Sequence, residues 1–192
     1  MRPGRGWPIA AAFAALLLGM APGPAAAQLD YAFMPKGGKA LLLEVLSGAG
    51  AGLSFEEMLS ARRTEDEWRE LLAPWAEGLS VRERQTLAVY LEVNLPVRDP
   101  GAVAAKRGDP GALYAALPRD GRELAWHECQ FCHSLFTSHL TQDRGVQAWM
   151  NMFESPFHRE MKMTPQEREE FSRYSAINMP MKMEDVPPDL RF

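Results

Sequence analysis

The sequence is poor in cysteine and histidine. Its 192 residues include two cysteines, Cys129 and Cys132, and four histidines. Two cysteines exclude a disulfide-rich scaffold and a four-cysteine zinc or iron–sulfur site within one chain. The formal charge is −4, from 21 basic and 25 acidic residues, and no basic stripe is present, so we expect no nucleic-acid partner. With 46% apolar and 24% charged residues, the composition is that of a globular protein.

Long apolar runs are also absent, except for one at the N-terminus. It follows Arg2 and Arg5 and ends at three small residues, 25–27, which predicts a signal peptide over residues 1–27. As a membrane anchor the run is short and interrupted, so we expect no stable membrane span after cleavage. Cleavage leaves 19 basic and 25 acidic residues, a charge of −6. The expected location is the periplasm, where thiols are usually oxidised.

Alternating strand patterns are missing, whereas helix starts are well marked. Segments that begin at Thr64, Ser80 and Thr164 have the capping-box form, in which a glutamate follows the cap residue by three positions. The last of them has proline at the first helical position. The pattern predicts an all-α chain. The carboxylate pairs Glu56-Glu57 and Glu169-Glu170 are expected on solvated helix faces rather than in a catalytic site.

The sequence repeats itself at offsets of 81 to 84 residues. Residues 80–97 align with 164–181 and share the ending Tyr-x-x-x-Asn-x-Pro, and 38–41 align with 121–124. Upstream of that ending, Trp68 aligns with Trp149. The repeat predicts two tandem helical domains, 28–110 and 111–192, joined by a Gly- and Pro-rich linker over 98–118. The alternative is a pair of unrelated amphipathic helices that share capping residues.

Both cysteines lie in a haem-attachment motif, Cys129-Gln130-Phe131-Cys132-His133. Residues three and four apart share one face of a helical turn. Two thiols can therefore form thioethers with the two vinyl groups of one haem, while His133 binds the iron as the proximal ligand. A disulfide or redox dithiol is the alternative, but the thioredoxin type needs a strand–helix–strand context. We expect one covalently bound haem c.

The first copy lacks these groups. Opposite the motif it has Leu-Ser-Gly-Ala-Gly at 46–50, and it contains no cysteine or histidine. We therefore expect no haem there, and we expect apolar and aromatic side chains to fill the space. The same side chains would form the core of an ordinary helical bundle, and both descriptions can hold. They are Trp68, Leu71, Leu72, Trp75, Leu79, Leu87 and Tyr90.

The C-x-x-C-H motif, the tryptophan 16 residues after it and the capped final helix ending in Tyr-x-x-x-Asn-x-Pro together resemble the small c-type cytochrome domains. The second copy is similar to the cytochrome modules of quinohaemoprotein dehydrogenases. The resemblance covers 121–181 with the motif and 38–97 without it. It implies two tandem cytochrome c-like domains, of which only the second binds haem. It also implies an electron carrier rather than an enzyme, and its redox partner would be a periplasmic dehydrogenase or another cytochrome.

The distal iron ligand stays open at this point. The resemblance implies a ligand seven to nine residues after Trp149, where His158 is the one residue of a type that binds iron. Alternatively, His158 is an ordinary surface histidine. Met163 has an alternative role too, as an apolar residue that packs just before the helix cap. With no distal ligand the protein would be a haem enzyme or gas sensor, and a third possibility is a docking or structural subunit of an oxidoreductase complex. The methionine candidates are Met161, Met163, Met179, Met181 and Met183.

Overall fold

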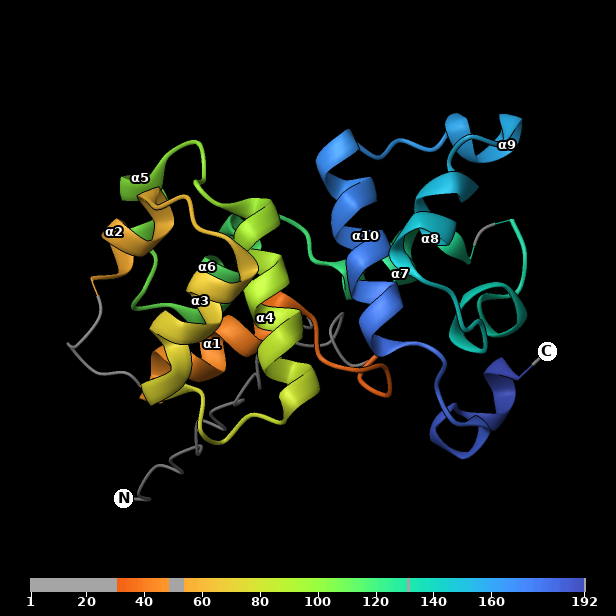
Figure 1. The fold of residues 1–192 in the computed structure, drawn as a ribbon, viewed down its shortest axis with the longest axis horizontal. Helices are drawn as coiled ribbons and strands as arrows, with labels where there is room; N and C mark the ends of the chain where they lie inside the picture. The colour runs from red at the N-terminus through yellow and green to blue at the C-terminus, as the bar shows by residue number, and fades with distance from the viewer. Residues whose placement is uncertain (1–30, 49–53, 131, 192) are drawn as a thin grey trace, which may run out of the picture.

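The computed structural model describes residues 31–48, 54–130 and 132–191, and its regular elements are helices (Figure 1). No strand occurs among these residues, so the all-α prediction is confirmed for them. The predicted signal peptide, 1–27, lies outside the described residues. None of the described helices is sufficiently long and apolar to span a bilayer.

The described residues form ten α-helices and several short turns. The α-helices are α1 (Gly38–Gly48), α2 (Phe55–Ser60), α3 (Glu65–Leu72), α4 (Val81–Asn94), α5 (Pro100–Ala104), α6 (Pro110–Ala116), α7 (Gly121–Cys129), α8 (Val146–Met152), α9 (Pro156–Arg159) and α10 (Pro165–Asn178) among the described residues. A π-helical turn covers Phe136–Leu140, and 3-10 turns cover Ala73–Trp75, Met183–Asp185 and Pro188–Leu190.

The three predicted helix starts are confirmed by their hydrogen bonds. The side chains of Thr64, Ser80 and Thr164 accept from the backbone N–H three residues on, and the glutamate there accepts from the N–H of the cap residue. These bonds satisfy two amides at each helix end, and one such cap contributes about 1 kcal/mol. The starts of α3, α4 and α10 are thus set by local sequence.

Buried hydrophobic side chains form two clusters, and Figure 1 shows the corresponding groups of helices side by side. The first cluster comes from α1–α6 and the second mainly from α7–α10. In the first, the residues expected to fill the space are buried or packed against the cluster. The fully buried ones among them include Trp68 and Tyr90, whereas Leu71 and Trp75 are partly buried.

Residues 98–118, expected as a linker, instead form α5 and α6. Each of these helices begins with an aspartate cap followed by proline, Asp99-Pro100 and Asp109-Pro110. Proline suits the first helical position because its missing N–H has no partner there. The segment also supplies three buried residues to the first cluster, Val103, Leu113 and Leu117. The glycine and proline content of this segment did not indicate its two capped helices.

Aligned residues of the two copies make equivalent contacts. A side chain at Gly38 would collide with Tyr90, and a side chain at Gly121 would collide with Tyr174. In both copies the glycine opens the first of the aligned helices, α1 or α7, and the tyrosine lies on the last of them, α4 or α10. These glycines therefore allow α1 to approach α4, and α7 to approach α10, more closely than any other residue would.

The two copies also contact each other reciprocally across α4 and α10. The hydroxyl of Tyr90 donates to the carbonyl of Pro118 (3.0 Å), and the hydroxyl of Tyr174 donates to the carbonyl of Pro35 (2.7 Å). These prolines precede α7 and α1 respectively, so each copy's last helix binds the segment that precedes the other copy's first helix. Such an exchange is the pattern of an isologous interface.

The segment that precedes α1 shows a further part of the repeat that sequence reasoning missed. Tyr31 and Met34 lie in the second hydrophobic cluster, although they precede the first helix. Tyr31-Ala32 and Tyr114-Ala115 are separated by 83 residues, and the two tyrosine side chains share a hydrogen bond. The common run Tyr-Ala-x-x-Pro-x-x-Gly, at 31–38 and 114–121, was a visible signal for this match.

One buried carboxylate caps helices of both copies. Asp120 accepts from the backbone N–H of Glu123 at the start of α7 and from that of Lys39 at the start of α1, both at 3.0 Å. Its side chain is fully buried, and burial together with the nearby Glu123 carboxylate raises the pKa of Asp120 to about 6. Asp120 therefore couples the two first helices directly.

The expected solvated position of Glu170 is wrong, whereas Glu56, Glu57 and Glu169 are exposed as expected. Glu170 is buried between the copies, where it accepts from the N–H of Gly121 (3.0 Å) and from the side-chain amide of Asn94 (3.2 Å). Burial and the Asp120 carboxylate raise the pKa of Glu170 to about 8.

Candidate haem site

The C-x-x-C-H motif lies where α7 ends. Cys129 is the last residue of α7 and packs, partly buried, against the second hydrophobic cluster. Cys132 is exposed, and both cysteines are free thiols in the described chain. Phe131 lies outside the described residues. The motif is therefore at the edge of the second core, where one cysteine faces apolar side chains and the other faces solvent.

A cavity of about 150 Å³ lies against His133. It is bounded by the end of α7, the π-helical turn and the C-terminal 3-10 turn. Its walls are mostly apolar, as is usual for cofactor pockets. Besides His133, the lining residues are Trp126, Gln130, Ser134, Leu135, Phe136, Leu140 and Leu190.

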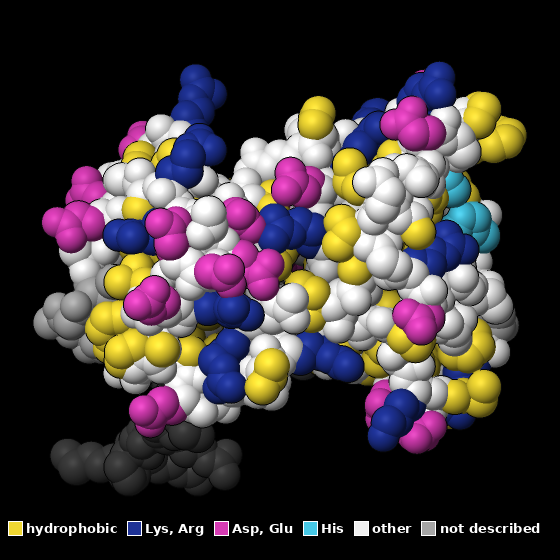
Figure 2. Space-filling view, viewed as in Figure 1, with side chains coloured by type: hydrophobic (Ala, Val, Ile, Leu, Met, Phe, Trp, Pro, Cys, Tyr) yellow, Lys and Arg dark blue, Asp and Glu magenta, His cyan; other side chains and the backbone are white. Residues whose placement is uncertain are grey.

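The ring of His158 lies close to the ring of His133. Their centres are 6.0 Å apart, and their planes meet at 79°. An imidazole nitrogen lies about 2 Å from a bound metal ion and the ring centre about 1 Å behind it, so two opposed ligands have centres roughly 6 Å apart. The observed separation of the two ring centres is of this size. His158 is only partly buried, and Figure 2 shows histidine side chains at the surface beside α9.

A serine hydroxyl orients His158. The Oγ of Ser155 lies 2.9 Å from Nδ1 of His158, so this ring nitrogen is already engaged. The other nitrogen, Nε2, is then the one available to a metal ion. Histidine ligands are commonly held in this way by a hydrogen bond at the second nitrogen. Sequence reasoning missed Ser155, although its spacing of three residues from His158 was visible.

The methionine candidates occupy other kinds of position. Met163 and Met179 are buried in the second hydrophobic cluster, which fits the apolar role considered for Met163. Met161 and Met181 pack against that cluster, whereas Met183 is largely exposed. Among the candidates for the distal ligand, His158 is thus the one whose ring lies beside that of His133. The methionines are distinguished only by their burial.

His139 is a core residue that the sequence did not single out. It is buried between the rings of Trp149 (5.1 Å) and Phe171 (5.3 Å), and its Nε2 lies 2.8 Å from the hydroxyl of Ser175. Burial lowers the pKa of His139 to about 3, so the ring stays neutral. A neutral histidine enclosed by aromatic rings serves packing.

Two buried indole nitrogens lack a hydrogen-bond partner among the described residues. One belongs to Trp149 in the second cluster and the other to Trp68, its match in the first. An unpaired buried donor can indicate an absent acceptor. Here the same feature occurs in the copy without the motif, so it does not distinguish a haem-binding copy.

The thiol environment bears on the redox-dithiol alternative. Burial and the neighbouring Glu128 carboxylate raise the pKa of Cys129 to about 12. Thiol–disulfide exchange proceeds through a thiolate, and catalytic dithiols lower the pKa of the attacking sulfur. The surroundings of Cys129 therefore disfavour that chemistry.

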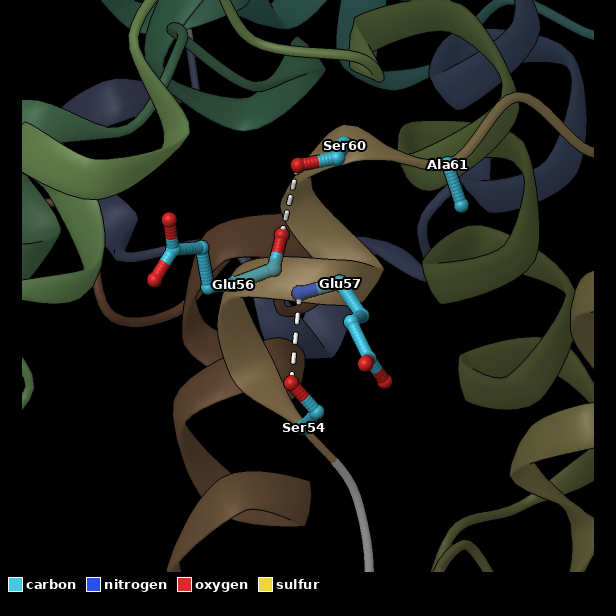
Figure 3. A pocket seen from close by; sticks show the side chains of 5 residues that line it. All are labelled: Ser54, Glu56, Glu57, Ser60 and Ala61. Atoms are coloured by element: carbon cyan, nitrogen blue, oxygen red, sulfur yellow. Dashed lines mark hydrogen bonds between the residues drawn. The ribbon is translucent and has the colours of Figure 1, made fainter.

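A larger hollow, about 480 Å³, lies at α2 and is shown in Figure 3. The two serine hydroxyls that line it form hydrogen bonds within the helix. The hydroxyl of Ser54 accepts from the N–H of Glu57 (3.4 Å), and the hydroxyl of Ser60 donates to the carbonyl of Glu56 (2.8 Å). The remaining lining residue is Ala61. We assign no chemistry to this hollow.

The described geometry thus places His133 at an apolar cavity, with the ring of His158 beside that of His133 and Ser155 bonded to His158. Comparisons with models of known families, with curated proteins and with solved structures found no match.

Proposed function

We propose that this chain is an exported c-type cytochrome that carries one covalently bound haem and transfers single electrons. Cys129 and Cys132 hold the haem through thioethers, and His133 and His158 are its two iron ligands. The observation that carries the proposal is the C-x-x-C-H motif together with a second histidine ring 6.0 Å from the first. When bound, the haem supplies a one-electron iron couple.

The residues of this chain favour electron transfer over gas binding. His133 and His158 would both hold the iron, which would leave no open position for a diatomic gas or a substrate. Trp126, Leu135 and Leu140 give the cavity beside His133 mostly apolar walls. Replacing the more usual methionine by His158 lowers the reduction potential, because thioether ligation raises it.

The first copy is proposed as a cytochrome c-like domain without haem. It lacks the cysteines and the proximal histidine, and its segment Ala73-Pro74-Trp75-Ala76 aligns with Ser155-Pro156-Phe157-His158 at an offset of 82. Alanine thus stands where the second copy has His158, and Ala76 is buried in the first hydrophobic cluster. Absence of both candidate iron ligands from one copy supports a common role for them in the other.

The electron partner is proposed to be a periplasmic dehydrogenase or another cytochrome. A mature charge of −6 favours a partner with a basic surface, since opposite charge accelerates encounter. The partly exposed His158, beside the exposed Phe157, offers a short route between the haem and a docked protein.

The test compares the parent protein with His158→Ala and His127→Ala after expression in a host that attaches haem c. His127 is the matched control, because it is an exposed histidine of α7. We expect six-coordinate haem and slow carbon monoxide binding in the parent and in His127→Ala. We expect an open iron and rapid carbon monoxide binding in His158→Ala. A thioether-to-iron charge-transfer band in the parent, or an unchanged spectrum in His158→Ala, would contradict the ligand assignment.

A further inference from the structure

Ser155 stands at the N-cap of α9 but does not cap it. At the starts of α2, α3 and α4, the cap hydroxyl accepts from a backbone N–H. The hydroxyl of Ser155 makes no such bond with α9 and lies instead 2.9 Å from Nδ1 of His158. A group suited to capping is therefore directed to the ring that we propose as the distal ligand.

We infer that Ser155 is a positioning residue for the distal histidine and that it lowers the reduction potential of the haem. The inference rests on the proposed function. When Nε2 of His158 binds iron, Nδ1 carries the hydrogen and donates it to the Ser155 oxygen. This bond fixes the rotation of the ring and raises the basicity of Nε2. A more basic ligand stabilises the oxidised iron more than the reduced iron.

The repeat gives independent support for the pair. At the aligned positions the haem-less copy has Ala73 and Ala76, so serine and histidine are absent together. Pro74 and Pro156 are retained between them, and both segments form a short helical turn between the tryptophan helix and the last helix. Serine is therefore not required to form the turn, because the first copy forms it with alanine.

The experiment measures the midpoint potential and the electron paramagnetic resonance spectrum of Ser155→Ala, Ser155→Thr and Ser155→Asp in the haem-loaded protein. Ser60→Ala is the control, because that hydroxyl binds only the carbonyl of Glu56 in the other copy. We expect Ser155→Ala to raise the potential by up to about 59 mV, a tenfold change in the preference for oxidised iron. Ser155→Thr should keep the midpoint potential of the parent protein. Ser155→Asp should lower the potential further, because a carboxylate is the stronger acceptor.

A purely structural serine would give a different result. Ser155→Ala would then lower stability and leave the potential and the resonance spectrum unchanged, which would overturn the inference. If Ser155→Ala loses its haem, equal potentials in Ser155→Thr and Ser155→Asp would overturn it instead. A thioether-to-iron charge-transfer band in the parent protein would instead refute His158 as the iron ligand. The spectrum of the parent protein is therefore recorded before the Ser155 variants are compared.

Discussion

The close approach of α7 and α10 can be tested by adding one carbon atom. Gly121 opens α7, and a Cβ built there would lie less than 3 Å from three side-chain atoms of Tyr174. Carbon atoms pack at about 3.5–4.0 Å, so Gly121→Ala must separate the two contacting groups by more than about 1 Å. Tyr174 also donates to the carbonyl of Pro35 over 2.7 Å, and that bond would be strained.

The expected cost follows from these contacts. Overpacking of a close interface costs about 1–3 kcal/mol, and a weakened hydrogen bond adds up to about 1 kcal/mol. The higher helix propensity of alanine offsets less than about 1 kcal/mol of this cost at a first-turn position. We therefore expect Gly121→Ala to lower the free energy of unfolding by about 2–3 kcal/mol, or the melting temperature by roughly 5–10 °C.

Urea and thermal unfolding, followed by circular dichroism, measure this change. Gly48→Ala is the control, because no atom lies within 4 Å of a Cβ built there, and its effect should stay within about 0.5 kcal/mol. Gly38→Ala should behave like Gly121→Ala, since a Cβ at Gly38 meets Tyr90 in the same way. The packing argument is refuted if Gly121→Ala is as stable as Gly48→Ala.

Two further predictions concern the buried acid and the motif. The pKa of Glu170 is raised from 4.5 to about 8, so its neutral form is favoured in the folded state and stability should fall as the pH rises through this range. Glu170→Gln should lessen that fall when urea unfolding is compared at pH values of about 5 and about 8. Cys129→Ala and Cys132→Ala should each lower the yield of protein with covalent haem in a haem-stained denaturing gel, with Ser60→Ala as the unaffected control; equal staining in all three would contradict attachment through both cysteines.

Local sequence was sufficient for much of the fold. The capping boxes at Thr64, Ser80 and Thr164 predicted three helix starts, because their hydrogen bonds involve only neighbouring residues. The same local chemistry was present at Asp99-Pro100 and Asp109-Pro110, but glycine and proline content favoured a linker there. Composition averages over a segment, whereas a cap depends on the order of two residues.

Burial and pairing across the chain were beyond local patterns. Glu170 resembles its exposed neighbour Glu169 in sequence, and only the contact between the two copies buries it. Asp120 serves helices of both copies, although Lys39 is 81 residues away. At the site, the spacing of Cys129, Cys132 and His133 was enough to recognise them as one motif. The position of His158 beside His133 depends on the fold, because the two residues are 25 positions apart.

The central claim, one covalent haem on an exported chain, is tested most directly by the intact mass of the purified protein under denaturing conditions. The account predicts the mass of the polypeptide from Gln28 to Phe192 plus one haem, which persists after unfolding because thioether bonds hold it. A mass equal to the bare polypeptide, or to the polypeptide with two haems, would contradict the account.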